Sequence, residues 1–241
     1  MNDFITFKAT HIGRDHRRPF GVGSSNNQDG MALVSSDSII VGVVCDGCGS
    51  GESSEVGAKL FAPIIANYLF ECAKNGLITR KVLIDTEKLI VDKISYLSNN
   101  PQDVEKFFLF TIIAFIIRED ISFIISYGDG MYLLNNIASQ IDQNNTPKYI
   151  GYKALSDNDD HFIFETIVTT ESIQTLAIAT DGASEVDIAE MMNKCTNNSL
   201  SLQRQLNIIG RTSVEISDGQ LIKSSGSIVD DTTIIGVKRC N

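Results

Sequence analysis

The sequence predicts an α+β fold in which helices cover β-sheets, and three observations support this prediction. Short runs of apolar and β-branched residues, separated by turn residues, are typical of strands and occur in both halves of the chain. Two longer segments repeat their apolar residues at the spacing of a helix. No repeat and no long linker interrupts the 241 residues. We therefore expect one layered domain that spans residues 1–241.

The N-terminal part should begin with three strands. Residues 4–11 have mixed polarity, residues 30–35 precede a Ser-Asp turn, and residues 38–45 form a nearly continuous apolar run. Such a run predicts a strand that is buried on both faces. The glycine-dense residues 46–51 end this strand.

Two helices should follow these strands. Ser53 or Ser54 can cap the first helix, and residues 74–76 mark its end. Thr79 can cap the second helix, which should run to a stop at residues 99–101.

The second half of the chain should alternate strands and helices. Further strands are expected at residues 108–117, 121–127, 131–135, 162–168, 175–180 and 232–238. Helices are expected at residues 185–195 and 200–209. Residues 138–160 are polar and rich in Asn and Asp, so we expect a loop there.

The charge balance excludes one functional class. The chain carries 30 acidic and 20 basic side chains, which gives a formal net charge of −10. A nucleic-acid binder needs Lys and Arg to contact phosphate groups, so no nucleic-acid partner is expected. Apolar residues make up 43% of the chain and only 4 residues are proline, which argues against disorder.

The cysteines and the apolar runs indicate a location in the cell. Five scattered cysteines do not form the pattern of a disulfide framework. The first residues do not read as a signal peptide, and the longest apolar run, residues 107–117, falls short of the roughly 20 residues that span a bilayer. We therefore expect a cytoplasmic protein with no membrane partner.

Aspartates occur where the predicted strands begin or end. Asp46, Asp129 and Asp181 follow strands, whereas Asp29 and residues 230–231 precede strands. Strand ends can converge at one edge of a sheet, and clustered carboxylates then need a cation or shared protons. Hard oxygen ligands of this kind suit Mg²⁺ or Mn²⁺. The alternative is that each Asp-Gly pair forms an ordinary turn.

Five short motifs contain these aspartates and follow one another in a recognisable order. They are Asn27-Gln28-Asp29, residues 43–51 with residues 54–58, residues 126–130, residues 176–185, and Asp230-Asp231-Thr232-Thr233. The ordered set resembles the metal-dependent serine/threonine protein phosphatases of type 2C (PPM) and covers about residues 11–238. Residues 12–16 further resemble a Gly-x-x-His element of a single-domain bacterial subgroup.

The resemblance implies a fold and a reaction. The fold would be a four-layer α/β/β/α sandwich of two antiparallel sheets flanked by helices. Two Mn²⁺ or Mg²⁺ ions, with a third and weaker site in many members, would activate a bridging water that attacks phosphoserine or phosphothreonine. The substrate would be a phosphorylated protein in a signalling pathway, and the partner would be the serine/threonine kinase that phosphorylates it.

The resemblance also assigns roles to residues. Asp46 would bridge the two metal ions, and Gly47 would offer its carbonyl to one of them. Asp181 and Asp230 would bind the opposite ion, and with Asp46 they would form the catalytic set. Asp29 would hold the cluster through water.

Three further acidic residues have secondary roles by the same resemblance. Asp129 and Glu185 match positions that bind the third metal ion in many members. Asp231 stands where Asn is frequent, so it is expected to support the site.

The chain departs from the family pattern in its expected phosphate-binding segment. Ser24 stands where many members have an Arg that binds the substrate phosphate. Side chains in the same segment could replace it, namely Arg14, His16, Arg17 and Arg18. The alternative is that this basic cluster is a solvated loop.

Cys48 is a second departure, because a variant of the motif has a His there that could act as a general acid. The pair Cys45 and Cys48 could also indicate redox or zinc chemistry, but a closed zinc site needs four ligands and no second pair is present. These departures leave two alternatives to a protein phosphatase: a phosphatase-like binding or regulatory module with little turnover, and a phosphatase of small phosphate monoesters.

Overall fold

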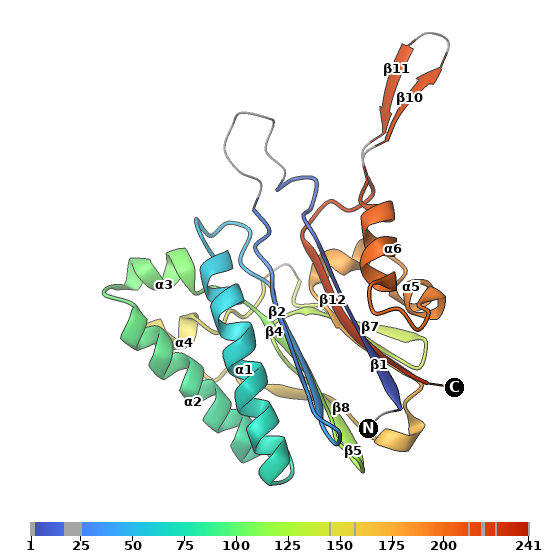
Figure 1. Cartoon of the computed structure of the whole chain (residues 1–241). Helices are drawn as coiled ribbons and strands as arrows, with labels where there is room; N and C mark the ends of the chain where they lie inside the picture. Colours follow the sequence, from blue (N-terminus) through green and yellow to red (C-terminus); the bar gives the residue numbers. More distant parts are fainter. Residues whose placement is uncertain are drawn as a thin grey trace.

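Two five-stranded antiparallel sheets pack face to face in the computed structural model, and helices cover their outer faces (Figure 1). The structure describes residues 3–16, 26–144, 146–156, 158–211, 213–217, 220–224 and 226–240. The predicted α+β class and the α/β/β/α layering are both confirmed.

The first sheet has the order β2-β3-β4-β5-β8. Its strands are β2 (Gly30–Ser35), β3 (Ile40–Cys45), β4 (Ile112–Ile117), β5 (Ile121–Tyr127) and β8 (Ile163–Thr169). All residues of β3 and β4 are buried, as the continuous apolar runs predict.

The second sheet has the order β1-β12-β9-β6-β7. Its strands are β1 (Phe4–His11), β12 (Thr232–Arg239), β9 (Thr175–Ala179), β6 (Gly130–Leu134) and β7 (Ile137–Ile141). The N-terminal and C-terminal strands are therefore paired with each other, with Phe4 opposite Arg239 and His11 opposite Thr232.

Helices form the two outer layers (Figure 1). On the first sheet, α1 (Glu55–Asn75) packs against β2 and β3, and α2 (Arg80–Leu97) packs against α1. The short helices α3 (Pro101–Phe107) and α4 (Tyr152–Leu155) lie beside them. On the second sheet, α6 (Ser201–Ile209) packs on β1 and contacts α5 (Ile188–Lys194).

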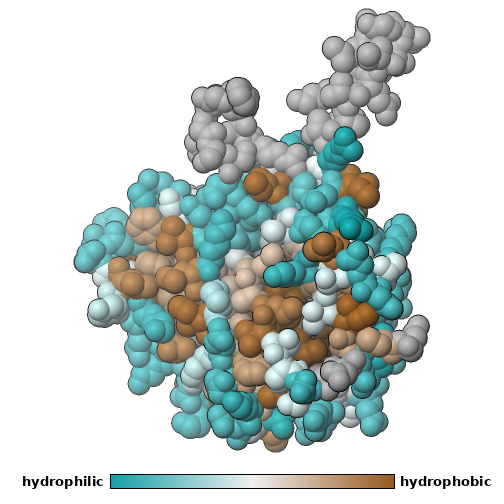
Figure 2. Space-filling view, in the orientation of Figure 1, coloured by the Kyte–Doolittle hydropathy of each residue, from teal (hydrophilic) through white to brown (hydrophobic). Residues whose placement is uncertain are grey.

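The main apolar core lies between the sheets and beneath the helices. One buried cluster joins β3 and β4 to β9 and β12, and includes Ile40, Phe115, Ile178 and Ile235. Partly buried apolar side chains, Met31 among them, pack against this cluster. Apolar surface is visible on the side of the molecule where Figure 1 shows the edge strands β1 and β2 (Figure 2). By length and composition α1 could cross a membrane, but its buried face packs on the first sheet, as in a core helix.

Several local predictions were wrong, each for a structural reason. Ser54 precedes α1, but its hydroxyl donates to the carbonyl of Cys48 instead of capping the helix. The second helix does end before residues 99–101 as predicted, at Leu97, but the short helix α3 that begins at Pro101 with Asn100 as its cap was not predicted. The strand expected at residues 108–117 starts only at Ile112, since residues 108–111 serve as backbone partners of other loops.

Four further elements lie in two segments that were not predicted as regular. The polar stretch expected to be a loop contains β7, which pairs with β6, and α4. A hairpin of β10 (Ser213–Ser217) and β11 (Gln220–Ser224) projects from the body (Figure 1). β7 is a short, exposed edge strand with the sequence Ile-Ala-Ser-Gln-Ile, so it lacks the apolar alternation of a half-buried strand.

Candidate functional site

One end of the sandwich collects the aspartates that begin or end strands. Asp46 follows β3, Asp29 precedes the antiparallel neighbour β2, and Gly30 pairs with Cys45, so both lie at the same end of the first sheet. On the second sheet, Ala179 pairs with Ile234 and with Met131, which brings the end of β9 to the beginnings of β12 and β6. Sheet topology therefore places carboxylates from both sheets together.

Asp46 occupies the central position of this cluster. Its backbone carbonyl accepts a hydrogen bond from Thr111, 2.9 Å away, which fixes the strand end. Burial and then the neighbouring carboxylates of Asp29, Asp181 and Asp230 raise the pKa of Asp46 well above its ordinary value. These groups therefore form one interacting set.

Gly47 follows Asp46 at a point where the backbone is tightly enclosed. A Cβ atom there would lie 2.6 Å from the carbonyl oxygen of Gln28 and 2.9 Å from the hydroxyl of Ser54. Only glycine fits this approach without displacing the segment before β2. The glycine thus keeps Asp46 and Asp29 close to each other.

Asp29 is buried, with 4% of its surface exposed. Its Oδ2 atom accepts a hydrogen bond from the hydroxyl of Thr180, 3.0 Å away. Its Oδ1 atom is buried without a hydrogen-bond partner among the described residues. Burial raises the pKa of Asp29 to about 7, although hydroxyl donors from Thr233 and Thr180 oppose the shift. An unpaired buried carboxylate oxygen is costly unless a cation or water binds it.

Asp129 lies in the turn that carries the chain from β5 in one sheet to β6 in the other. The glycines on both sides have positive φ angles, 98° at Gly128 and 138° at Gly130. These conformations favour glycine and point to a tightly specified turn. Burial and then the charge of Asp181 raise the pKa of Asp129 to about 6.

The aspartates line a cavity of about 350 Å³. Asp46, Asp129, Asp181 and Asp230 form one part of its wall, and Gly47 lies beside them. Burial raises the pKa of Asp230, partly offset by the backbone N–H of Asp231. The structure thus gathers five of the predicted metal-binding residues around one cavity, with Asp29 coupled to Asp46 from outside it.

Asp231 and Glu185 are positioned as structural links instead. The Asp231 carboxylate accepts hydrogen bonds from the backbone N–H groups of Gly13, at 2.8 Å, and Gln28, at 2.6 Å. His16 Nδ1 lies 2.8 Å from the same carboxylate and 3.6 Å from Asp230. Glu185 is exposed, accepts a hydrogen bond from the N–H of Val229 and does not line the cavity.

The predicted phosphate-binding segment is only partly described. Arg14 is half-exposed, pairs with Asp15 at 3.2 Å and does not line the cavity. His16 lies nearer, since its Nε2 atom would be 4.0 Å from a Cβ atom placed on the cavity residue Gly49. Ser24, Arg17 and Arg18 lie outside the described residues.

The sequence analysis missed two residues that complete the cavity wall. Pro147 and Tyr149 come from the segment that follows β7, far along the chain from the aspartate motifs. The Tyr149 hydroxyl helps to lower the pKa of Cys48, whose Sγ atom lies 3.2 Å from the hydroxyl of Ser50. Only the fully buried Ile150 within this polar stretch signals that the segment packs against the body.

Cys48 occupies the turn that follows Asp46. Burial opposes ionisation of the thiol, but the Ser50 and Tyr149 hydroxyls and two backbone N–H groups outweigh it and lower the pKa of Cys48. All five cysteines are free, and Cys45 is fully buried behind the cavity, which gives no four-ligand zinc site around this pair.

The donor set around the cavity fits a hard divalent cation. It consists of carboxylate oxygens, a glycine backbone and the unpartnered Asp29 oxygen, and such cations prefer oxygen ligands. In the described part of the chain, no three His, Cys, Asp or Glu side chains are grouped closely enough to hold one ion by themselves. Mg²⁺ commonly binds through one or two carboxylates and keeps several waters, so shared carboxylates completed by water satisfy it.

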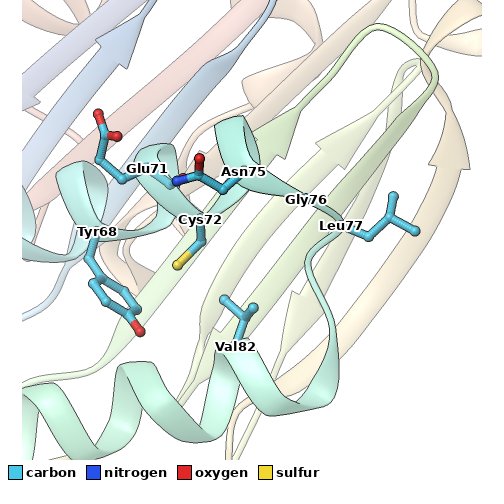
Figure 3. Close-up of a pocket in the computed structure, with 7 residues that line it drawn as sticks. All are labelled: Tyr68, Glu71, Cys72, Asn75, Gly76, Leu77 and Val82. Carbon is cyan, nitrogen blue, oxygen red and sulfur yellow. The ribbon is translucent and has the colours of Figure 1, made fainter.

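Another cavity, larger than the one lined by the aspartates, lies in a different part of the molecule. It measures about 450 Å³ and lies between α1 and α2 (Figure 3). Its wall consists of Tyr68, Glu71, Cys72, Asn75, Gly76, Leu77 and Val82. None of the described site residues lies there, so size alone does not identify the site.

Comparisons with known proteins agree with this architecture. Residues 12–220 match the family model described as protein phosphatase 2C. A bacterial serine phosphatase has a similar solved structure, with a TM-score of 0.64, 15% identity, and coverage of 98% of this chain and 97% of that one. The serine/threonine phosphatase Stp1 from Staphylococcus aureus has a TM-score of 0.62 and 14% identity, over 98% of this chain and 94% of that one.

Two further similar structures were solved with metal ions. The catalytic domain of the serine/threonine phosphatase PstP, in complex with 2 manganese ions, has a TM-score of 0.59 and 10% identity over 99% of both chains. RsbX, in complex with magnesium, has a TM-score of 0.56 and 15% identity, over 100% of this chain and 97% of that one. Comparison with curated protein sequences gives no match.

Proposed function

The chain belongs to the protein phosphatase 2C family, and on that premise we propose that it hydrolyses phosphoserine and phosphothreonine in proteins with the help of divalent cations. The observation that carries the proposal is the convergence of aspartates from both sheets on one cavity. Like charges at that density are unfavourable without cations, so a role in cation binding accounts for their placement.

We assign the cation ligands residue by residue. Asp46 would bridge two ions of Mn²⁺ or Mg²⁺, with the Gly47 carbonyl beside it. Asp181 and Asp230 would hold the opposite ion, and the free Oδ1 atom of Asp29 would anchor water bound to the pair. Bound divalent cations supply an activated water and neutralise the phosphoryl oxygens.

The protein's own groups then act as a rigid frame. The hydrogen bond from Thr111 to the Asp46 carbonyl and the glycine-flanked turn at Asp129 hold these two carboxylates in fixed positions. Side chains that are already in place need less reorganisation during the reaction. A third and weaker ion would involve Asp129, with Glu185 reaching it only after leaving its hydrogen bond to Val229. His16, Arg14, Arg17 and Arg18 remain candidates for contact with the substrate phosphate.

The proposal extends to partners and location. The substrates would be phosphorylated proteins in a signalling pathway, and a serine/threonine kinase would supply them. The similar structures of PstP and RsbX were solved with manganese and magnesium, which supports Mn²⁺ or Mg²⁺ as the proposed cation. The scattered free cysteines support a location in the cytoplasm.

Phosphate release from a phosphothreonine peptide tests the proposal. We expect release with Mn²⁺, loss of release with a chelator, and recovery when Mn²⁺ is added in excess. Asp46→Asn and Asp181→Asn should each lower kcat at least about 100-fold while circular dichroism stays unchanged. Asp92→Asn, on the exposed face of α2, is the matched control and should keep full activity. Wild-type rates in either active-site variant would refute the site assignment.

A second candidate function is a phosphatase-like module that binds a phosphoprotein without turnover. Arg14 stands away from the cavity, and Ser24 and Cys48 replace residues that assist catalysis in the family, which favours this alternative. Calorimetric Mn²⁺ binding without hydrolysis of any phosphopeptide would support it. Hydrolysis of small phosphate monoesters alone would instead identify a small-molecule phosphatase.

A further inference from the structure

We propose that Tyr149 is a specificity-determining residue that contacts the peptide part of the substrate. The inference deepens the proposed phosphatase function and rests on it. The cavity is lined by residues of two chemical kinds: the carboxylates of Asp46, Asp129, Asp181 and Asp230, and the apolar or ring surfaces of Pro147 and Tyr149. A phosphate with its cations belongs against the carboxylates, which leaves the surfaces of Pro147 and Tyr149 to the group that carries the phosphate.

The position of Tyr149 is fixed by backbone contacts on a shared support. The N–H of Cys48 donates to the carbonyl of Leu109, 2.9 Å away, and the N–H of Ile150 donates to the carbonyl of Phe110, 3.2 Å away. Both acceptors belong to the segment of residues 108–111. The turn after Asp46 and the segment of Tyr149 are therefore held by the same piece of chain.

Side-chain contacts then fix the orientation of the ring. The ring of Tyr149 packs against Tyr152 with centroids 5.9 Å apart, and its hydroxyl lies near enough to the Cys48 thiol to lower the pKa of that thiol. Burial raises the pKa of Tyr149, so the hydroxyl keeps its proton and remains a donor. The ring is half-buried and borders the cavity, so it presents an aromatic surface that is already in place.

An aromatic and proline surface of this kind suits an extended peptide. Aromatic rings contribute large contact areas at low entropic cost, and proline is equally rigid. A phosphopeptide reaches beyond the phosphate and can pack its backbone and side chains on this surface. A compact aliphatic monoester such as glycerol 2-phosphate has too few atoms to use it.

The test compares these two substrates in Tyr149→Ala. We expect the KM for a phosphothreonine peptide to rise about tenfold, which corresponds to one lost aromatic contact, with kcat within about twofold. The kcat/KM for glycerol 2-phosphate should stay within about twofold of wild type. Tyr149→Phe keeps the ring and should stay within about threefold for both substrates.

Tyr96→Ala is the matched control, because Tyr96 in α2 is 88% exposed and does not line the cavity. It should leave the peptide KM within about threefold of wild type. Tyr149→Leu keeps apolar volume and replaces Tyr149→Ala if that variant does not fold, with an expected rise in KM of at least about threefold. An unchanged peptide KM, or an equal loss for both substrates, overturns the inference. If the wild-type protein hydrolyses neither substrate with Mn²⁺, the proposed function itself fails.

Discussion

Asp46 and Asp181 lie at the ends of strands in different sheets, β3 and β9, and both line the same cavity. After burial and the charge of Asp29, the charge of Asp181 helps to raise the pKa of Asp46. The packing of the two sheets therefore brings like charges together at the site. In the absence of cations, protons are the remaining means of reducing the repulsion.

We predict that the metal-free protein loses stability as the pH rises through the acidic range. Asp29 has a folded-state pKa of about 7 against an ordinary value of 3.8, so the folded state binds more protons than the unfolded state between these limits. Stability from this group is then present below about pH 4 and is lost as the pH rises to about 7. We expect a loss on the order of 3 kcal/mol, measured by urea denaturation in chelator between about pH 5 and about pH 8.

Asp29→Asn provides the control, because other carboxylates titrate in the same range. Subtracting the profile of the variant from that of the wild type isolates the contribution of Asp29. Added Mn²⁺ should stabilise the wild type more at about pH 8 than at about pH 5, since protons compete with the cation. Identical profiles for the two proteins would contradict this account.

We predict that Asp231 stabilises the fold more than its neighbour Asp230 does. Asp231→Ala leaves the buried N–H groups of Gly13 and Gln28 without their acceptor, which should cost about 2–4 kcal/mol. Asp230 has a side chain that is 55% exposed, so Asp230→Ala should change the stability of the metal-free protein by less than about 1 kcal/mol. Urea denaturation of both variants in chelator gives the comparison, and equal losses would contradict the difference in role.

The parts of the fold that were predicted correctly depend on local sequence signals. The apolar run of β3, the Thr79 cap of α2 and the turn residues between strands each carry their structure within a short window. The strand β7 could not be predicted in this way, because it is formed by pairing with β6 and its sequence has no alternation of apolar and polar residues. The role of Ser54 could not be predicted either, because its hydroxyl donates to the carbonyl of Cys48 in a loop, and a helix pattern carries no signal for that contact.

In the candidate site too, features that depend on neighbouring residues could be predicted from the sequence, and features that depend on distant residues could not. The aspartates at strand ends could be predicted, because a strand followed by Asp-Gly is visible in the sequence and the topology brings such ends together. Tyr149 could not, because its segment is held beside the cavity by the backbone hydrogen bond from its neighbour Ile150 to Phe110. Glu185 matches a motif, yet the structure uses its carboxylate to hold Val229.

We predict that Gly128→Ala destabilises the protein by about 2 kcal/mol or more. Its φ angle of 98° disfavours any residue with a Cβ atom, and that atom would lie 2.6 Å from the Thr111 side chain and 2.9 Å from the carbonyl of Lys148. Gly76→Ala is the matched control, because nothing lies within 4 Å of its added Cβ atom. The control should be neutral or slightly stabilising in thermal denaturation. Equal effects at the two glycines would show that backbone strain at Gly128 is not limiting.

We predict that Glu87 anchors the distal half of the segment that carries Tyr149. Glu87 in α2 is buried and accepts hydrogen bonds from Lys153 Nζ at 3.0 Å, His161 Nδ1 at 2.8 Å and the N–H of Phe162 at 2.7 Å. Glu87→Ala removes the acceptor for all three donors and leaves the Lys153 charge only 12% exposed and unpaired. The expected cost is about 3–5 kcal/mol. Glu71→Ala, which breaks an exposed pair with Lys74 at 3.8 Å, should cost less than about 1 kcal/mol.

Hydrogen exchange locates the effect of Glu87→Ala within the segment. The N–H of Phe162 loses its acceptor and should exchange much faster, whereas the N–H of Ile150 keeps its bond to Phe110 and should retain its relative protection. The two ends of the segment are held by independent contacts, so loosening one should not release the other. Faster exchange at Ile150 to the same extent as at Phe162 would mean instead that the segment opens as one unit. In that case Tyr149 would depend on Glu87 for its position, and the variant would also raise the KM for a phosphopeptide.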